Sequence, residues 1–455
     1  MLLRFGVANH RSIRDYQEMY LSASKRIKRK GLVIPVPTLK EAAVPVVAIY
    51  GANAAGKSNL IDAMYGMQRA IVQSHKSLDA TDRIPRNPFR LDEMTAATPT
   101  RFDCTFTVGE RSTKGPDSNT VYEYGFEYTD AEFQHEWLYR VVRKERQSTQ
   151  VLFDRKTEDG VVRVRFGNQL RGENRTIVNL TRRNSLFLSA AAQNNHPQLT
   201  ELHRYFVEQW QVIMSAGDLP DQVVAARLSE FEHMNRLLVL VRQADVGISD
   251  IDVEDAELED DGSALMRDLA EVMVKHMRRE GGDDSMSLED LLDVMRHSQK
   301  LRFVHSAAGG GTAGLQYSME SKGTRTLISL LIPALEVLSR GTLLVIDELD
   351  TSLHPSIARA FVSLFSKEVS NPHGAQLVFS THDVALLGSD LIHQDEIWMT
   401  DKGHEGVSRF TPLTEFKLRS RDDIEKAYRH GRLGGVPIGD EFFIDFDAGE
   451  FPAES

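Results

Sequence analysis

One segment, Gly51–Ser58, constrains the fold of this 455-residue chain more than any other. Its letters GANAAGKS fit the pattern GxxxxGK[ST], and the preceding run VPVVAIY (44–50) is apolar throughout, as in a parallel strand covered on both faces. The residues that follow, 61–75, have the apolar spacing of a helix. A strand, a loop of small residues and a helix in this order predict a P-loop, in which backbone N–H groups surround phosphate oxygens.

The P-loop pattern predicts which of its residues contact a nucleotide. Lys57 is expected to reach the β- and γ-phosphates, and the Ser58 hydroxyl to bind Mg²⁺. The other candidates for contact with the nucleotide are Gly51, Asn53, Gly56 and Asn59. The cofactors predicted from the sequence are therefore ATP and Mg²⁺.

A second apolar run, 342–346, ends in two adjacent acids, Asp347 and Glu348. A buried strand that ends in two carboxylates is costly unless cations lie opposite them, and a P-loop supplies a lysine and a metal ion. We therefore expect Asp347 to hold Mg²⁺ through water, and Glu348 to orient the water that attacks the γ-phosphate. The predicted reaction is Mg-dependent ATP hydrolysis.

The order of motifs beyond the P-loop resembles that of the ABC-type ATPases. Ser321-Lys322-Gly323 precedes a helical run, Asp350 follows the acid pair, and His382 follows the apolar run QLVFS. In that family a Ser-x-Gly signature caps a helix, a D-loop follows the acid pair, and a switch histidine ends the next strand. The signature serves the γ-phosphate held by a second protomer, so that two nucleotides lie between two heads.

This resemblance implies a set of site residues and an oligomer. The catalytic residues would be Glu348, His382 and Asp347. Ser321, Gly323 and Asp350 would complete the nucleotide contacts, and the chain would form a homodimer or higher homo-oligomer. A Q-loop glutamine, expected as a further metal ligand, has no sharp pattern here. Gln193 lies in the expected place, after the strand-like SLFLS and before a helical region.

Short similar segments along nearly the whole chain make the resemblance more specific. The opening LLRFGVANHRSI is similar to the start of the SMC/RecF/OLD branch. The segments NPFRLDE, VYEYGFEY, MESKGTRTL, DELDTSLHP, FSTHD and YRHGRLGGVP are similar to stand-alone ABC ATPases of bacterial defence systems, including PARIS-like and other abortive-infection operons. The resemblance implies a sensor or regulatory ATPase that holds or releases a separate effector, a nuclease or toxin, in anti-phage defence.

Three other functions are weighed against this one. The signature SKGT differs from the transporter-like SGGQ, which disfavours a transporter motor. About 70 residues follow His382, too few for the Toprim nuclease domain of OLD-type proteins, so a nuclease would be a separate chain. A RecF-like DNA-binding repair ATPase stays the alternative, because residues 1–200 carry 30 Lys+Arg against 21 Asp+Glu. Nucleic acid therefore stays a candidate partner.

The predicted fold class is α/β, an ABC-type P-loop ATPase head with an antiparallel β subdomain and an inserted helical lobe. The strands of the subdomain are expected at RFDCTFTV, VYEYGFEY, HEWLYRVVRK, VVRVRFG and NSLFLS. The expected domains are an N-terminal ATPase lobe (1–195), a helical insertion (196–300), a C-terminal ATPase lobe with the signature, acid pair, D-loop and switch histidine (301–415), and a tail (416–455). About 290 residues separate the P-loop from the acid pair, without the sustained heptads of coiled-coil arms.

Composition bears on the compartment and on partner surfaces. The chain has one cysteine, Cys104, and no apolar run near the ~20 residues that span a bilayer. The N-terminus is too charged for a secretory signal. We therefore expect a soluble, cytoplasmic protein that does not bind membranes. The basic clusters 25–30 and 140–146 and the acidic stretch 251–300 are not explained by an ATP site, and there we expect a partner to bind.

Overall fold

The structure is a computed structural model. It describes residues 1–24, 31–109, 120–143, 147–158, 160–214, 221–229, 231–244, 247–257, 297–307, 309–417 and 424–433. The basic segment 25–30, residues 144–146, most of the acidic stretch 251–300 and the tail from 434 lie outside this range. Within the described residues, no helix has both the length and the apolar character needed to cross a membrane.

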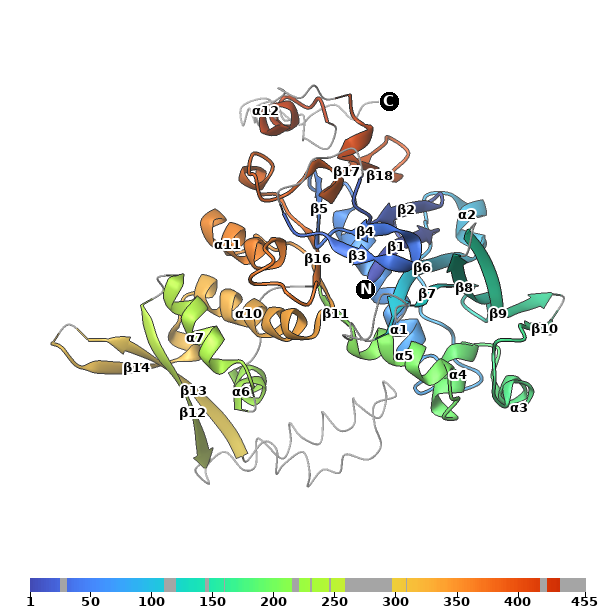
Figure 1. Ribbon diagram of the computed structural model, residues 1–455, viewed down its shortest axis with the longest axis horizontal. Helices are drawn as coiled ribbons and strands as arrows, with labels where there is room; N and C mark the ends of the chain where they lie inside the picture. The colour runs from blue at the N-terminus through green and yellow to red at the C-terminus, as the bar shows by residue number, and fades with distance from the viewer. Residues whose placement is uncertain are drawn as a thin grey trace, which may run out of the picture.

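A six-stranded sheet of order β11-β15-β16-β5-β17-β18 carries the P-loop (Figure 1). Only its edge strand β18 runs antiparallel to its neighbour. The strands are β11 (Trp210–Ile213), β15 (Leu343–Ile346), β16 (Gln376–Ser380), β5 (Val46–Gly51), β17 (Ile397–Lys402) and β18 (Ser408–Pro412). Because parallel strands end at one edge of a sheet, the residues that follow β5, β15 and β16 meet there.

Helices cover both faces of this sheet. Figure 1 shows α10 and α11 on one side, and α1 with a second sheet on the other. The α-helices are α1 (Lys57–Gln73), α2 (Glu93–Ala97), α3 (Asn174–Leu180), α4 (Phe187–Gln193), α5 (Leu199–Glu208), α6 (Asp221–Ser229), α7 (Met234–Gln243), α10 (Lys322–Arg340), α11 (Pro355–Ser366) and α12 (Ile424–Arg429).

Alternate residues of β5 belong to two different hydrophobic cores. Val47 and Ile49 pack in the core that contains α1, whereas Val46, Ala48 and Tyr50 pack in the core that contains α10 and α11. All five are 0% exposed. The continuous apolar run before the P-loop is therefore explained by burial on both faces, as predicted for a central parallel strand.

The predicted antiparallel subdomain is a seven-stranded sheet of order β10-β9-β8-β7-β6-β1-β2. One face packs aromatic side chains against α1, α4 and α5 in the same core as α1. The strands are β1 (Leu2–Ala8), β2 (Gln17–Tyr20), β6 (Thr100–Val108), β7 (Thr120–Tyr128), β8 (Phe133–Arg143), β9 (Gln147–Glu158) and β10 (Val161–Phe166). Helix α1 thus lies between the two sheets, which fixes the start of the helix relative to both.

The prediction of a strand at NSLFLS was wrong, because this segment starts α4. The buried Glu136 carboxylate accepts hydrogen bonds from the N–H groups of Phe187 (2.6 Å) and Leu188 (3.0 Å). It also accepts from Arg155 (3.3 Å), whose guanidinium is buried beside it. A carboxylate that satisfies the first N–H groups of a helix favours the helical form. That carboxylate lies 51 residues earlier in the chain, beyond the reach of a local pattern.

The prediction of a helical stretch from 196 to 300 holds for α5, α6 and α7 and fails at two strands. β11 joins the central sheet beside β15, and β12 (Ile248–Glu257) pairs with β13 (His297–Ser306), which pairs with β14 (Thr312–Gln316). In β12, Ile251 and Val253 alternate with acids, the two-residue period of a strand. The remaining small sheet is the hairpin β3 (Ile34–Val36) and β4 (Glu41–Ala43).

Candidate functional site

The loop between β5 and α1 is shaped by close packing behind it. Gly56 has φ 113°, a conformation that favours glycine. A Cβ at this position would lie 2.2 Å from Ser408 Oγ and 2.9 Å from Ser12 Oγ, so a side chain has no room. Ala54 also has a left-handed backbone, with φ 62°. Glycine is therefore required at position 56 both by the backbone conformation and by the close packing of the neighbouring side chains.

Three polar side chains from distant segments form the packing behind the loop. Ser12 Oγ lies 2.7 Å from Ser408 Oγ and accepts a hydrogen bond from Asn59 Nδ2 (2.5 Å). Ser408 Oγ donates to the Ala55 carbonyl. Ser12 and Ser408 are separated by 396 residues, and sequence reasoning missed both. Asn59, predicted to contact nucleotide, points its amide into this cluster.

The helix that follows the loop is also tied to the N-terminal segment. Asp62 on α1 accepts hydrogen bonds from Arg11 Nε (2.5 Å) and Arg11 Nη2 (2.9 Å), and its Oδ2 lies 2.7 Å from His10 Nε2. These partners hold the pKa of Asp62 below its usual value despite its burial. The opening residues ANHRSI thus support the first turns of α1, a contribution that their resemblance to the SMC/RecF/OLD start did not specify.

Lys57 is a buried cation that is bound by backbone carbonyls. Its side chain is nearly inaccessible, and Nζ donates to the carbonyls of Gly51 (2.9 Å) and Ala52 (3.1 Å). Burial lowers the pKa of Lys57 to about 8, although Asp347, Glu348 and Asp350 oppose the shift. Within the described residues Lys57 forms no ion pair with a carboxylate. The ammonium therefore lacks a strong anionic partner.

The acid pair after β15 is held by Ser380, the last residue of β16. Ser380 Oγ donates to Asp347 Oδ1 (2.5 Å) and accepts from the Glu348 N–H (2.7 Å). Asp347 is 7% exposed, whereas Glu348 is open to solvent. One hydroxyl thus joins the ends of two neighbouring parallel strands. Sequence reasoning quoted the run QLVFS but did not assign its serine a role.

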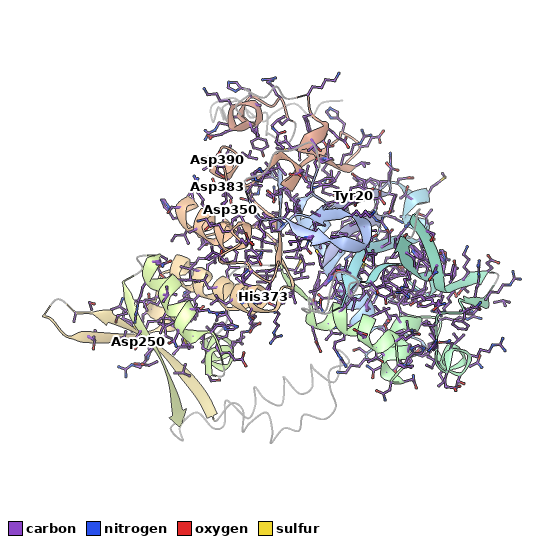
Figure 2. The ribbon with its side chains drawn as sticks, in the orientation of Figure 1. Tyr20, Asp250, Asp350, His373, Asp383 and Asp390 are labelled. Atoms are coloured by element: carbon purple, nitrogen blue, oxygen red, sulfur yellow. The ribbon has the colours of Figure 1, made fainter. Side chains whose placement is uncertain are left out.

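The residues after the acid pair form a tight turn that contacts the switch histidine. Glu348 has φ 53°, and Thr351 Oγ1 donates to its Oε2 (3.1 Å). The Asp350 carboxylate accepts from the His382 N–H at 3.1 and 3.3 Å. Asp350 and Asp383 lie close together in Figure 2. Nδ1 of His382 is 3.5 Å from Lys57 Nζ, so the three predicted segments converge.

The surroundings of His382 favour its neutral form. Burial lowers its pKa, the nearby ammonium of Lys57 lowers it further, and Asp350, Glu348 and Asp347 act in the opposite direction. A neutral imidazole can donate one hydrogen bond and accept another. The neutral ring can therefore donate a hydrogen bond to an anion that binds beside it.

The predicted signature lies at the start of α10. Ser321 is the N-cap, and its hydroxyl accepts from the Thr324 N–H (3.1 Å). A Cβ on Gly323 would lie 2.9 Å from the Ser352 carbonyl oxygen, so the D-loop backbone packs directly on this glycine. The contacts of Ser321 and Gly323 thus run to Thr324 and to the D-loop rather than to the P-loop of the same chain.

The structure does not bring Gln193 to the site. It is exposed at the end of α4, and α4 contacts the far end of α1, where Ser189 Oγ accepts from Ser74 Oγ (3.2 Å). Ser74 lies 17 residues beyond Lys57, or roughly 25 Å along a helix. The segment that does lie beside the acid pair is the end of β11, since the Asp347 N–H donates to the Ile213 carbonyl. Residues 215–220 after it lie outside the described range.

The remaining predicted residues lie on the open side of the loop. Asn53 is exposed and Ser58 is half-buried at the start of α1. Asp347, whose Oδ1 accepts a hydrogen bond from Ser380, and Ser58 would hold Mg²⁺. A hydroxyl and a carboxylate are ligands that Mg²⁺ accepts, with water and phosphate oxygens completing its shell. The donor set therefore fits this ion.

A cavity of about 410 Å³ lies next to the loop. Arg11, Ser12 and Asn59 line one side, and the segment 87–91 (NPFRL) lines another. Phe89 is buried, and its N–H donates to Asn9 Oδ1 (2.8 Å). The cavity combines arginine side chains with an apolar wall, and it adjoins the phosphate loop through Asn59.

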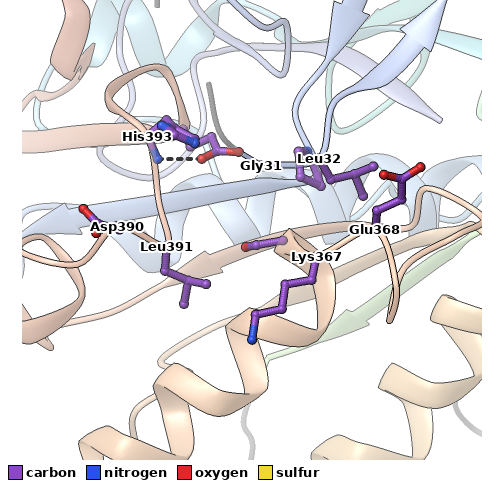
Figure 3. A pocket seen from close by; sticks show the side chains of 10 residues that line it. Gly31, Leu32, Lys367, Glu368, Asp390, Leu391 and His393 are labelled. Atoms are coloured by element: carbon purple, nitrogen blue, oxygen red, sulfur yellow. Dashed lines mark hydrogen bonds between the residues drawn. The ribbon is translucent and has the colours of Figure 1, made fainter. Parts of the chain in front are cut away.

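A second cavity, of about 370 Å³, lies away from these residues (Figure 3). Its lining includes Gly31, Lys367, Asp390, His393 and Glu396. The His393 N–H donates to Glu396 Oε2 (2.6 Å), as the dashed line in Figure 3 shows. None of the residues predicted from the motifs lines this cavity.

Comparison with known proteins gives a family match and similar solved structures. Residues 46–388, about three quarters of the chain, match the family described as "AAA domain, putative AbiEii toxin, Type IV TA system". No curated protein matches the sequence. Among solved structures, the chain is similar to an Smc head bound to the C-winged helix domain of ScpA (13% identity, 90% of this chain and 96% of that chain, TM-score 0.39). It is also similar to an Smc head domain with a coiled coil and joint from Pyrococcus yayanosii (12% identity, 95% and 99%, TM-score 0.37).

The region matched by the family model runs from β5 to just beyond the switch histidine. It contains the P-loop, the signature, the acid pair and His382, the segments that the structure brings to one sheet edge or its neighbourhood. The chain therefore belongs to this AAA-domain family, and its fold is that of a P-loop ATPase.

Proposed function

We propose that this protein binds and hydrolyses ATP with Mg²⁺ at the edge of the central sheet. The observation that carries the proposal is the position of Lys57. Among the described residues, this buried ammonium contacts two backbone carbonyls and, at 3.5 Å, His382 Nδ1, and it pairs with no carboxylate. A bound polyanion would stabilise this ammonium more strongly than neutral carbonyl groups do. The P-loop N–H groups at the start of α1 favour phosphate for the same reason.

Each residue has a role that its surroundings support. Lys57 exchanges the carbonyls of Gly51 and Ala52 for β- and γ-phosphate oxygens. Asp347 and Ser58 would hold Mg²⁺, which supplies neutralisation of phosphate charge. Glu348, exposed and oriented by Thr351, accepts a proton from the attacking water.

The remaining contacts extend along the nucleotide. His382 donates a hydrogen bond to the γ-phosphate, the role implied by the resemblance to ABC-type ATPases. The cavity lined by Arg11 and the segment 87–91 is large enough for a base and ribose, and it adjoins the P-loop. We assign it the nucleoside end of ATP.

The signature supports a site that two copies of the chain complete. Ser321 and Gly323 present a helix N-terminus, yet their contacts run to the D-loop and not to the P-loop of the same chain. A helix N-terminus binds anions. In the proposed homodimer, this end of α10 contacts the γ-phosphate held by the partner copy.

The output of the ATPase is proposed to be a change of shape that a separate effector reads. The support is twofold: the family description names a toxin of a type IV toxin–antitoxin system, and several segments resemble ATPases of phage-defence operons. Hydrolysis alone harms neither a phage nor its host, so an ATPase of this kind needs a partner that responds to its conformation. The RecF-like repair ATPase is the competing function.

The first prediction tests the ATPase itself. Purified protein hydrolyses ATP slowly with Mg²⁺. Lys57→Ala loses nucleotide binding, because the ammonium is the main protein cation at the phosphates. Glu348→Gln binds ATP but hydrolyses it at least ~100-fold more slowly, the usual scale of a lost general base. Binding is measured by calorimetry and turnover by phosphate release. Asp401→Asn, at the exposed end of β17, is the control. Equal turnover by wild type and Glu348→Gln removes Glu348 from its role.

A second prediction follows from the lowered pKa of Lys57. Below pH 8 the free site already carries the ammonium, whereas above pH 8 binding of phosphate must take up a proton. ATP affinity therefore falls by about tenfold for each pH unit above 8, until the pKa of the bound state is reached. Calorimetry from pH 7 to pH 9.5 measures this slope. Lys57→Arg keeps its charge throughout and should lose the slope; a flat profile for wild type contradicts the assignment.

The third prediction concerns the composite site. Ser321→Arg places a bulky cation where the γ-phosphate of the partner copy would arrive, so ATP binding survives and hydrolysis is lost. Mixing Ser321→Arg with Lys57→Ala chains restores part of the activity, because each mixed dimer contains one site with both halves intact. The readout is phosphate release against the mixing ratio. Absence of any recovery in verified mixed dimers shows that one chain completes its own site.

The fourth prediction separates the two cellular functions. Expressed alone, the protein gives no protection against phage, whereas expression with its neighbouring gene gives protection that Glu348→Gln abolishes or locks. Plaque counts and growth curves measure both effects. Protection or toxicity from the isolated ATPase contradicts a separate effector. DNA that binds in a salt-sensitive way and stimulates hydrolysis would move the repair function to first place.

A further inference from the structure

The segment that leads into the signature is packed against a strand of another sheet. It consists of the short helical turn Tyr317–Met319 and Glu320. The strand is β13, the middle strand of the sheet β12-β13-β14, which Figure 1 shows beside α6 and α7. Leu301 and Phe303 of β13 are buried in the core that also contains α10. The start of α10 and this sheet therefore share one core.

Two contacts join β13 to this segment. The ring of Phe303 lies 5.8 Å from the ring of Tyr317, centroid to centroid, and both residues are 0% exposed. His305 follows two residues later on the same face of β13, and its Nε2 lies 2.6 Å from Glu320 Oε1. The Glu320 N–H donates to the Tyr317 carbonyl (3.1 Å). Two successive side chains on one face of β13 thus hold the turn at both of its ends.

The Glu320 carboxylate is buried, and within the described residues His305 is its one hydrogen-bond partner. The side chain of Glu320 is 6% exposed. An ionised carboxylate only accepts hydrogen bonds, so the imidazole N–H of His305 donates to it. On the other side of the imidazole, a Cβ on Gly247 would lie 3.4 Å from His305 Nδ1. Because a buried carboxylate without a hydrogen bond is costly, the pair fixes the direction in which Glu320 points.

The position of Glu320 bears directly on the signature. Glu320 precedes Ser321, the N-cap of α10, and Gly323 packs on the Ser352 carbonyl oxygen of the D-loop. The first turn of α10 is therefore held between β13 on one side and the D-loop on the other. Its N–H groups are the anion-binding groups of the proposed composite site. A misplacement of about 1 Å in such a site can lower the rate by about 100-fold.

We propose that Glu320, held by His305, is a positioning residue of the composite ATP site. The pair fixes the N-terminus of α10 where the γ-phosphate held by the partner copy arrives, so this inference rests on the proposed composite site. The pair also keeps the carboxylate away from the phosphate. A carboxylate released by His305 would be free to accept hydrogen bonds from the first N–H groups of α10, and it would then compete with phosphate for them.

The first test is Glu320→Ala, which removes the carboxylate and leaves Ser321 in place. Turnover, measured by phosphate release, falls by about tenfold or more, the scale of a lost hydrogen bond to a charged group. Affinity for Mg-ATP, measured by calorimetry, stays within about twofold of wild type, because the P-loop of the same chain is a separate part of the fold. Mixing Glu320→Ala with Lys57→Ala chains restores part of the activity. Mixing it with Ser321→Arg chains restores none, because Glu320 and Ser321 belong to the same half of the site.

Two variants of His305 test the hydrogen bond itself, and they decide the question if Glu320→Ala does not fold. His305→Gln keeps an N–H donor, and its turnover should stay within about threefold of wild type. His305→Phe keeps the bulk without a donor, and its turnover should fall as far as that of Glu320→Ala. The matched control is His135→Phe on the antiparallel sheet, where His135 Nε2 lies 3.2 Å from Asp154 Oδ1. This variant loses a pair of the same kind and should keep wild-type turnover.

The outcomes separate this inference from the proposed function. A lower melting temperature of Glu320→Ala with unchanged turnover overturns the positioning role, because the pair then only stabilises the fold. Loss of ATP affinity together with turnover overturns it too, as does equal turnover by His305→Gln and His305→Phe. Wild type that fails to bind ATP refutes the proposed function, and absence of recovery between Ser321→Arg and Lys57→Ala refutes the composite site. If both of these hold and Glu320→Ala keeps wild-type turnover, only the role of Glu320 is refuted.

Discussion

The parallel pairing of β15, β16 and β5 is the constraint on which the rest of the site depends. The register aligns Ile346 with Phe379, and Phe379 with Ala48, so the three strands end at nearly the same level. The segments that follow them supply the acid pair, the switch histidine and the P-loop. Ser380 then joins two of these ends through a single hydroxyl, and the Thr381 N–H donates to the Ile49 carbonyl between the other two. The site is therefore an extension of the sheet and not a separate arrangement of loops.

Electrostatics at this edge are unbalanced. Burial lowers the pKa of Lys57 from 10.5 to about 8. This fall corresponds to roughly 3 kcal/mol, the amount by which the cost of burying the ammonium exceeds its attraction to three carboxylates. The carboxylates do not pair with the ammonium directly, since Asp347 bonds Ser380, Glu348 bonds Thr351, and Asp350 bonds the His382 N–H. Each acid is held by a neutral donor, and the lysine by neutral acceptors. The ammonium and the carboxylates therefore do not neutralise each other. A bound anion would neutralise the ammonium, and a divalent cation would neutralise the carboxylates.

Sequence reasoning succeeded where the signal is contiguous and failed where the cause is distant. The P-loop, the acid pair and the strand before Gly51 could be predicted. The strand is buried on both faces, and each of these signals lies within a short run of consecutive residues. The helix α4 could not, because its first N–H groups are satisfied by Glu136 from another strand. The assignment of Gln193 depended on α4 being a strand and failed with it. Ser12 and Ser408, which shape the loop at Gly56, come together only through the tertiary fold. The alternation of apolar and acidic residues in β12 was a usable signal for a strand, but the density of acids suggested a solvated segment instead.

The contact between the D-loop and the signature links the two ends of the proposed composite site. A Cβ on Gly323 would lie 2.9 Å from the Ser352 carbonyl oxygen, so the two backbones pack closely together. The same turn begins at Glu348 and is held at Asp350 by the switch histidine, which lies beside Lys57. We propose that a change at the phosphates of one chain would pass through His382, Asp350 and Ser352 to the N-terminus of α10. If that end of α10 contacts the nucleotide of a partner copy, each site responds to the state of the other through rigid backbone contacts.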